Sequence, residues 1–528
     1  MDDAPGWSPA RRSLRMPSGR RSRIALGLAV IALALTAPAP AARARPATGV
    51  PPPEWAVNPW PAHNHDLANT RATTDTAIDA RTVAGLRLKW RFAFTGTSSF
   101  GVFASAPIVI GDTVYLQDLN SNVYALARAT GRLRWAHRFD EPNVGPNGIS
   151  LGWGRLYGAT TSSAFALDPA TGRLLWSRTL TRSGHEGIEI APQLYDHTVL
   201  FSTVPSNVSG SYRPGAYGVV WALDARTGTP RWHFDTVAGG ARLWGDPALN
   251  GGGGLWYPPA VDAHGRVFLA TANPAPFPGT KAFPNGASRP GPNLYTDSLV
   301  ALDGRTGTLL WYRQAVPHDV RDYDLAISPI VTTLRLGAED AEVVITAGKM
   351  GRVYAYRADD GAPLWETPVG RHEHDEGPLP AAPVVVYPGT LGGVETPMAL
   401  AGTRVFVPWV DLATRASATS SNGVDPIAEG RGGFSALDAA TGRVLWQHAL
   451  PSPDFGAATV ANDVVFTSTY DGTVYAFASA TGRQLWSARA RAGINAFPAI
   501  AGKLLLVGAG APGSGAHAHA ELSAYSLP

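Results

Sequence analysis

The sequence predicts an all-β fold: an eight-bladed β-propeller whose N- and C-terminal strands pair to close the ring. Three observations support this prediction: a repeated Trp-containing segment, a base period near 40 residues, and an incomplete repeat unit at each end. The chain has 528 residues, of which only 16% are charged, with 58 Gly, 44 Pro and 16 Trp. This composition is typical of short strands joined by tight turns, and the repeat indicates one domain.

The repeat unit consists of an apolar strand, aromatic-Ala-Leu-Asp, Ala-Thr-Gly and x-Leu-x-Trp. Successive tryptophans lie 45, 41, 56, 79, 54, 81 and 40 residues apart, which indicates four-stranded blades with insertions. Each Trp is expected to pack between neighbouring sheets, and each turn Gly is expected to adopt a positive φ. The units end at Trp90, Trp135, Trp176, Trp232, Trp311, Trp365, Trp446 and Trp486.

Aspartates precede several of these turns, and we expect them to accept turn amide hydrogen bonds rather than to catalyse. They are Asp168, Asp224, Asp303 and Asp438.

The two ends of the repeat region are half units. Residues 86–92 contain a Trp-bearing fourth strand without a third, and residues 522–527 contain a third strand without a fourth. Joining them completes the eighth blade and leaves no exposed strand edge.

Residues 1–44 have the layout of a secretory signal: a basic stretch, an apolar run over 24–35 and small-residue cleavage sites. The run is too short to span a bilayer. We therefore expect no transmembrane span in the mature chain, an N-terminal extension over 45–85 and the propeller over 86–528. Export to the periplasm or the cell exterior follows, by either the Sec or the twin-arginine route.

Removal of residues 1–44 deletes seven Arg and two Asp and takes the formal charge from +3 to about −2. This leaves no electrostatic case for nucleic acid binding. The chain has no cysteine, which excludes disulfides, cysteine-ligated zinc and a covalently attached c-type haem.

The repeats, together with the segment Trp60-Pro61-Ala62-His63-Asn64-His65-Asp66-Leu67-Ala68-Asn69-Thr70-Arg71, resemble those of the pyrroloquinoline quinone (PQQ) quinoproteins. This is the family of methanol, ethanol and polyvinyl alcohol dehydrogenases, and the resemblance covers roughly residues 55–528. It implies PQQ as hydride acceptor, a metal ion as Lewis acid and a small-molecule or polymeric alcohol as substrate. Propellers of outer-membrane assembly lipoproteins share the repeat without binding quinone. The site residues therefore have to distinguish a quinone-binding propeller from one that binds no quinone.

Two segments match the family's cofactor floor and metal ligand. Trp256, which follows four glycines, stands where the family has a Trp beneath the quinone, and it does not occupy the repeat's own Trp position. Asn273, in Thr-Ala-Asn-Pro-Ala-Pro, matches an Asn that ligates the metal through its side-chain oxygen. The alternative for Asn273 is an ordinary Asn-Pro turn.

The most specific resemblance is Pro317-His318-Asp319-Val320-Arg321-Asp322-Tyr323-Asp324. It implies that Asp322 is the catalytic base and a metal ligand, although Arg321 stands where Trp is usual. Asp324 matches an additional Asp of the lanthanide-dependent branch, so both Ca²⁺ and a lanthanide ion stay open. Lys349 matches a family residue that bonds the quinone oxygens.

One expected metal ligand is missing. The family's Glu in the third unit is replaced by Arg213, which cannot ligate a cation, and Glu189 is a hypothetical substitute. The acidic His372–Glu376 segment is interpreted as a solvated loop.

The leading interpretation is a PQQ-dependent alcohol dehydrogenase that passes its electrons to a separate acceptor. The alternative is a noncatalytic propeller that serves as a binding or envelope-assembly module. Arg213 favours the alternative, whereas Trp256, Asp322 and Lys349 together favour the enzyme.

Overall fold

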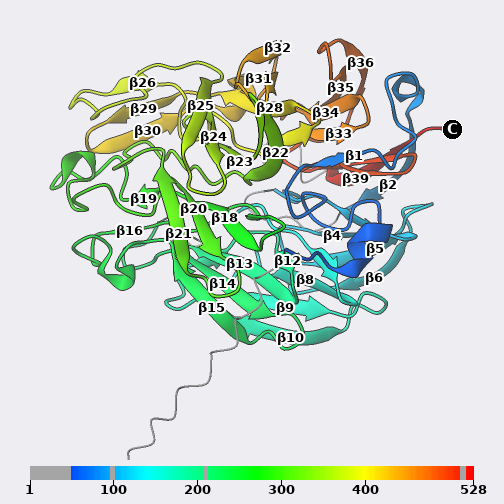
Figure 1. Cartoon of the computed structure of the whole chain (residues 1–528), viewed down its shortest axis with the longest axis horizontal. Coiled ribbons are helices and arrows are strands. Elements are labelled where there is room, and N and C mark those ends of the chain that lie inside the picture. The colour runs from blue at the N-terminus through cyan, green and yellow to red at the C-terminus, as the bar shows by residue number, and fades with distance from the viewer. Residues whose placement is uncertain (1–48, 95–100, 207–211, 512–518) are drawn as a thin grey trace, which may run out of the picture. The chain divides into compact units, whose positions relative to one another are not determined.

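The predicted all-β fold is confirmed by the computed structural model, in which strands predominate among the described residues and the 3-10 helices are only three to five residues long. The described residues all belong to one compact unit, Pro46–Pro528. The predicted signal sequence lies outside the described residues. The structure describes residues 49–94, 101–206, 212–511 and 519–528 (Figure 1).

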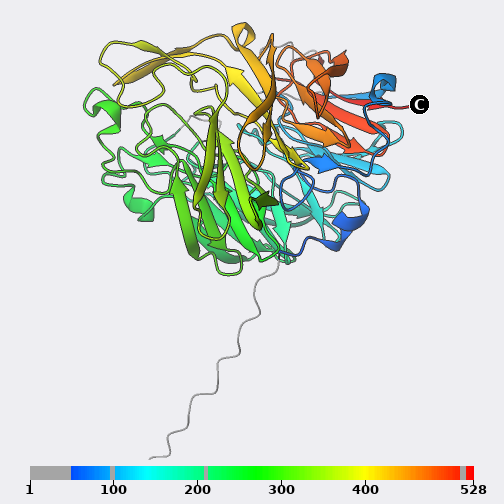
Figure 2. The ribbon, with the colours of Figure 1, turned by 45° about the horizontal axis from the view of Figure 1, so that its top comes forward.

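Sheets of four or five strands succeed one another along the chain, and neighbouring sheets lie side by side in two views (Figures 1 and 2). Their strands pair in antiparallel fashion, except that β1 pairs with β33 in parallel. The first four sheets contain β3 (Ile108–Ile110), β4 (Thr113–Gln117), β5 (Val123–Ala127) and β6 (Leu133–His137); β7 (Ser150–Gly152), β8 (Arg155–Ala159), β9 (Ser163–Leu167) and β10 (Leu174–Thr179); β11 (Gly187–Ile188), β12 (Gln193–Tyr195), β13 (Thr198–Val204), β14 (Val219–Asp224) and β15 (Pro230–Asp235); and β17 (Ala260–Val261), β18 (Arg266–Ala270), β20 (Ser298–Asp303) and β21 (Leu309–Gln314).

The remaining sheets of this kind contain β22 (Ile330–Leu336), β23 (Glu339–Gly348), β24 (Arg352–Arg357) and β25 (Pro363–Pro368); β27 (Ala399–Ala401), β28 (Arg404–Asp411), β31 (Arg431–Asp438) and β32 (Val444–Leu450); β1 (Ala72–Thr73), β33 (Thr459–Ala461), β34 (Val464–Ser468), β35 (Thr473–Ala478) and β36 (Gln484–Arg489); and β2 (Arg87–Ala93), β37 (Ala499–Ala501), β38 (Leu504–Ala509) and β39 (Glu521–Ser526).

Insertions between these strands form the remaining elements. They are β16 (Gly251–Gly252) with β19 (Pro274–Ala275); β26 (Val384–Val386) with β29 (Thr414–Ser417) and β30 (Ser420–Val424); and the 3-10 helices η1 (Pro53–Val57), η2 (Val83–Gly85), η3 (Gly240–Arg242), η4 (Pro284–Gly286) and η5 (Ile427–Glu429). None of the helices among the described residues has the length and apolar character needed to cross a membrane.

Each repeat Trp links its own sheet to the next one, as the sequence predicts. Trp135, for example, donates its indole N–H to the Pro169 carbonyl at 3.1 Å, and a Cβ on Gly172 would lie 2.5 Å from the Trp135 ring. Gly172 has a φ of 72°. The turn Gly therefore satisfies two requirements: a positive φ and close contact with the preceding Trp.

The aspartates before these turns have the predicted structural role. The Asp168 carboxylate accepts the amide N–H groups of Ala170 and Thr171 at 3.0 and 2.9 Å. Asp224, Asp303 and Asp438 make the same kind of turn bonds.

The two ends of the repeat region share one sheet. β2 pairs with β39 in antiparallel register from Arg87 opposite Ser526 to Ala93 opposite Glu521. β39 also pairs with β38, so the N-terminal strand becomes the outer strand of a sheet built from the C-terminal residues. This is the pairing of half units expected from the sequence.

A strap, defined as residues 60–77, runs along the first strands of the sheets. Its carbonyl groups accept backbone N–H groups from β3, β7, β17, β22, β27 and β33. The donors and acceptors are Val109 to Trp60, Leu151 to Pro61, Val261 to Leu67, Val331 to Ala68, Leu400 to Thr70 and Val460 to Arg71, at 2.7 to 3.3 Å.

Arg71 is the most heavily bonded side chain of the strap. It is fully buried, and its guanidinium donates to the carbonyls of Ala458, His63 and Pro498 and to Asn64 Oδ1 and Thr459 Oγ1, at 2.7 to 3.2 Å. These bonds use all five of its donors. Burial lowers the pKa of Arg71 to about 9.

Replacement of Arg71 by Met is expected to lower the free energy of unfolding by at least about 3 kcal/mol, because it leaves five acceptors without their donors. Urea denaturation followed by tryptophan fluorescence measures this change. Arg81→Met is the matched control, since the Arg81 side chain is 90% exposed. Equal denaturation midpoints for the two variants would contradict the role assigned to Arg71.

Candidate functional site

The predicted site residues lie on loops that follow the second and fourth strands of their sheets. In an antiparallel meander these loops emerge at the same end, so residues distant in sequence can converge. A cavity of about 460 Å³ lies among them. It is lined by Ala104, Val144, Gly145, Pro146, Trp256, Tyr257, Asp324, Ala326, Ile327, Lys349, Leu391, Glu395, Ile427, Phe455, Tyr470 and Asn495.

The loop after β21 is shaped by Asp319. Its carboxylate accepts the backbone N–H groups of Arg321 at 2.8 Å and Tyr323 at 2.9 Å. Asp322 lies between these two residues and has a φ of 70°, a left-handed conformation that Asp tolerates better than most residues. Asp319 therefore has a structural role: it fixes the turn that presents Asp322.

Arg321, which replaces the usual Trp, ties this loop to the following insertion. Its guanidinium donates to the carbonyls of His374, Glu376 and Gly377 at 2.8 to 2.9 Å. The same insertion is bonded through Asp375 and Glu376 to Arg352. The His372–Glu376 segment is thus a loop anchored by ion pairs and main-chain bonds, in which the side chains of His374 and Glu376 stay exposed, as the sequence analysis expects.

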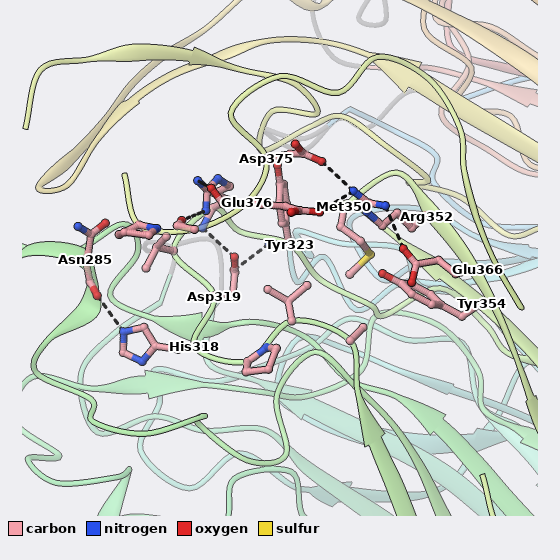
Figure 3. A pocket seen from close by; sticks show the side chains of 17 residues that line it. Asn285, His318, Asp319, Tyr323, Met350, Arg352, Tyr354, Glu366, Asp375 and Glu376 are labelled. Atoms are coloured by element: carbon pink, nitrogen blue, oxygen red, sulfur yellow. Dashed lines mark hydrogen bonds and ion pairs between the residues drawn. The ribbon is translucent and has the colours of Figure 1, made fainter. Parts of the chain in front are cut away.

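A second cavity, of about 520 Å³, is lined by other residues of the same loop, among them His318, Asp319 and Tyr323 (Figure 3). Tyr323 and Met350 line it, whereas their chain neighbours Asp324 and Lys349 line the first cavity. In Figure 3, Arg352 lies between Glu366 on one side and Asp375 and Glu376 on the other. Its charge is balanced by these carboxylates, so it is not available to the first cavity.

Lys349 is brought to the aspartates by a close backbone approach. A Cβ on Gly348 would lie 2.2 Å from the Asp324 carbonyl oxygen, so only Gly fits at this position. The Lys349 N–H donates to that carbonyl at 2.9 Å. The ammonium then contacts Asp322 Oδ2 at 3.0 Å and Asp324 Oδ2 at 2.7 Å.

Asp322 and Lys349 form a buried charge pair in which one ammonium serves two aspartates. Burial, reinforced by the charge of Asp324, raises the pKa of Asp322 well above its usual value, against the opposing effect of Lys349. Burial lowers the pKa of Lys349, but the surrounding carboxylates outweigh it and raise that pKa well above its usual value. Asp322 Oδ1 has no hydrogen-bond partner. Asp322 Oδ1 is therefore the carboxylate oxygen that is free to accept a proton, while Oδ2 is bonded to Lys349.

Glu395 is a third carboxylate at Lys349 that the sequence analysis missed. The Val394 N–H donates to the Gly348 carbonyl at 3.0 Å, and a Cβ on Gly393 would lie 2.1 Å from the Lys349 carbonyl oxygen. Glu395 lines the cavity, and its Oε1 is buried without a partner. Burial raises the pKa of Glu395 to about 7. The Gly392-Gly393 pair, which precedes Val394 and Glu395, is the sequence feature that could have indicated this close backbone approach.

Trp256 lines the cavity and is packed against Gly145, which lines the same cavity. A Cβ on Gly145 would lie 3.0 Å from the Trp256 ring and 2.8 Å from Glu189. Glu189 is therefore beside Trp256 rather than in an ion pair with the Lys349 cluster. Both of its carboxylate oxygens are buried without partners, and burial raises its pKa well above the usual value.

Asn273 is fully buried beside Asp324. Its backbone N–H donates to Asp324 Oδ1 at 2.8 Å, and its own Oδ1 has no partner. Two residues that the sequence analysis missed are also buried with unpartnered oxygens: Asp297 and the phenol of Tyr212. Burial and the charges of Asp324, Asp322, Asp297 and Glu189 raise the pKa of Tyr212 well above its usual value.

Unpartnered buried oxygens are candidate ligands for a cation, and the sequence analysis predicts Asn273, Asp322, Asp324 and Glu189 as the metal ligands. Within the described ranges, no three His, Asp or Glu side chains are grouped closely enough to hold a metal ion. The free oxygens of Asn273 and Asp322 nevertheless supply the hard donors that Ca²⁺ or a lanthanide ion requires. The assignment of these four ligands stays a prediction.

A model of the PQQ family described as "Glucose/ethanol/alcohol dehydrogenase, beta-propeller domain" matches residues 60–149 and 180–380. This is more than half of the chain, and the chain therefore belongs to this family of PQQ-dependent alcohol dehydrogenases. A second model, described as "Outer membrane protein assembly factor BamB", matches residues 395–516.

Individual relatives agree with this assignment. The quinohemoprotein alcohol dehydrogenase of Comamonas testosteroni is 27% identical, over 83% of this chain and 70% of its own. The polyvinylalcohol dehydrogenase of Sphingopyxis sp. (strain 113P3) is 25% identical, over 87% of this chain and 73% of its own. The crystal structure of the Comamonas enzyme matches with a TM-score of 0.76 at 23% identity and covers 89% of this chain and 80% of that one. This likeness shows the β-propeller fold.

The raised pKa of Glu395 predicts a pH-dependent contribution to stability. Because the folded pKa of about 7 exceeds the ordinary value of 4.5, the native state binds this proton more tightly than the unfolded state. The contribution is complete below about pH 4.5 and is lost as the pH rises through 7. The stability of Glu395→Gln relative to the parent protein should therefore increase between pH 5 and pH 8.

Thermal unfolding at pH 5, 6, 7 and 8 measures this difference. The control is Glu339→Gln, because the Glu339 side chain is exposed and lines neither of the two cavities. A pH-independent difference between Glu395→Gln and the parent protein would show that Glu395 does not titrate in this range.

Proposed function

We propose that this protein is a PQQ-dependent dehydrogenase that oxidises an alcohol. The observation that carries the proposal is that Trp256, Asp324 and Lys349 line one cavity, with the Asp322 carboxylate 3.0 Å from the Lys349 ammonium. Trp256, Asp322 and Lys349 are the residues that the resemblance assigns to the floor, the base and the quinone contact. No packing rule of a propeller blade requires all three.

The cavity suits PQQ in size and in the chemistry of its walls. Trp256 offers an aromatic face to a planar tricyclic ring, and Lys349 offers a cation to its oxygens. When bound, PQQ supplies the hydride acceptor and the metal ion supplies the Lewis acid that polarises the quinone carbonyl. Asp322 accepts the hydroxyl proton of the alcohol through its unpartnered Oδ1. Lys349 holds Asp322 in place through Oδ2.

The metal ion is proposed to be Ca²⁺ or a lanthanide, held by Asn273, Asp322, Asp324 and Glu189. The unpartnered oxygens of Asn273 and Asp322 support the first two assignments. Asp324 would have to exchange its Lys349 contact for the ion. Both carboxylate oxygens of Glu189 are also unpartnered, and the charge of Glu189 acts on the Tyr212 phenol together with those of Asp322 and Asp324, which supports its place among the ligands. Arg213, at the family's Glu position, offers no ligand.

The electrons are proposed to pass to a separate acceptor, because the chain has no cysteine for covalent haem attachment. The basic and apolar layout of residues 1–44 supports export to the periplasm or the cell exterior and cleavage near Arg45.

The finer architecture is proposed as one ring of eight blades closed by β2 and β39. The successive four-stranded sheets and the β2–β39 register support this arrangement. Residues 45–85 then form an extension that includes the strap, and residues 86–528 form the propeller.

A noncatalytic role as a binding or envelope-assembly module is the second candidate. The match of residues 395–516 to an outer-membrane assembly factor favours it, together with Arg213 at the position of a ligand. The residues that match that factor lie outside the segment that holds Trp256, Asp322 and Lys349.

Reconstitution distinguishes the two functions. The mature chain, expressed without PQQ, is expected to retain PQQ in the presence of Ca²⁺ or La³⁺, as followed by quinone absorbance, and to reduce a dye with alcohols. Asp322→Ala should lower the rate of dye reduction at least about a hundredfold, because the general base is lost. Asp340→Ala, on a side chain that is 68% exposed, is the control. A chain that retains no PQQ with either ion fits only the noncatalytic module.

A further inference from the structure

We propose that the phenol oxygen of Tyr212 is a ligand of the cation, and that it takes the place of the carboxylate that is missing at Arg213. This role rests on the proposed function, because that function requires a Ca²⁺ or lanthanide ion beside Asp322. Tyr212 is adjacent to Arg213 in sequence, so the third unit still supplies an oxygen to the site.

The Tyr212 hydroxyl is one of several buried oxygens of this region that lack a hydrogen-bond partner. The others include Asn273 Oδ1, Asp322 Oδ1 and both carboxylate oxygens of Glu189. Burying a polar atom without a partner costs free energy, so oxygens of this kind indicate a group that they hold when it is bound. A Ca²⁺ or lanthanide ion accepts neutral and anionic oxygens together, and it would satisfy phenol, amide and carboxylate at once.

Two glycines bring the chain at Tyr212 close to the chain at Asn273. A Cβ on Gly251 would lie 2.9 Å from the Arg213 carbonyl oxygen. A Cβ on Gly252 would lie 2.9 Å from the Asn273 carbonyl oxygen, on the side where β16 pairs with β19. Because neither glycine has a side chain, only main-chain atoms of β16 separate the loop of Tyr212 from the segment of Asn273.

The aromatic ring of Tyr212 is held against the same segment. It packs edge-on against Phe277, with ring centroids 5.5 Å apart and an interplanar angle of 85°. Phe277 lies four residues after Asn273. The backbone of Tyr212 is left-handed, with a φ of 43°, which an aromatic residue rarely adopts. Ring and backbone together fix the phenol beside the segment that carries the predicted ligand Asn273.

The Tyr212 phenol is surrounded by acidic groups. Burial and the charges of Asp324, Asp322, Asp297 and Glu189 raise the pKa of Tyr212 well above its usual value. Three of these four carboxylates are predicted metal ligands. Since no three acidic or His side chains of the described residues are grouped closely enough to hold an ion, neutral oxygens have to complete the coordination. A phenol supplies such an oxygen without adding a negative charge to those of the aspartates.

The first test is calorimetric titration of the protein with La³⁺, with and without PQQ. Tyr212→Phe should bind La³⁺ at least about tenfold more weakly than the parent protein, because Phe keeps the ring and its contact with Phe277 but removes the ligand oxygen. The control is Tyr157→Phe, since the buried Tyr157 hydroxyl donates to the Ala225 carbonyl at 3.0 Å, outside both cavities. This control should bind La³⁺ as the parent protein does.

The second test counts the water molecules bound to the ion. The luminescence decay of bound Eu³⁺ is compared in water and in heavy water. Tyr212→Phe should show about one more bound water than the parent protein, because water takes the vacated position in the coordination sphere. A role of Tyr212 in packing alone would leave this count unchanged. Circular dichroism melting of both variants checks that they fold.

Equal La³⁺ affinities of Tyr212→Phe and Tyr157→Phe would overturn the role of Tyr212 and leave the proposed dehydrogenase intact. An unchanged water count in Tyr212→Phe would overturn that role as well. If the parent protein binds no ion, with or without PQQ, the assignment of Tyr212 fails together with the metal-dependent function proposed above.

Discussion

The main-chain hydrogen bonds between the strap and the first strands of the sheets are the interaction on which the rest of the structure depends. Successive strap carbonyls bond to sheets that are hundreds of residues apart in sequence. Arg71 adds side-chain bonds to residues 387 and 427 positions away. The loops that carry the cavity belong to these same sheets. Their relative positions, and therefore the distances between candidate catalytic groups, are set by how the strap holds the sheets together.

Lys349 has a comparable role at the level of the site. Two glycines, Gly348 and Gly393, allow three backbone segments to meet without side chains between them. The ammonium is consequently shared among acidic groups from different loops, and their protonation is linked. A site of this kind has few independent parts, because a change in one carboxylate alters the electrostatic environment of the others.

The repeat pattern was sufficient to predict the all-β fold, the packing of the tryptophans and the role of the turn aspartates, because these are local and periodic. Motif resemblance located Trp256, Asp324 and Lys349, which line one cavity. It did not predict Glu395, Asp297 or Tyr212, since each enters the site through long-range backbone packing rather than through a motif of its own. The contact of Arg321 with the His372–Glu376 insertion was missed for the same reason.

The strap also constrains the order in which the molecule can be completed. Its residues are synthesised first, yet their partners include Val460 and Gly502, which are among the last to be made. Open repeat arrays can add units one at a time, since each repeat contacts only its neighbours. Here the earliest segment stays unsatisfied until the chain is nearly whole, which ties folding to the release of the full polypeptide and makes the native state a late, collective event.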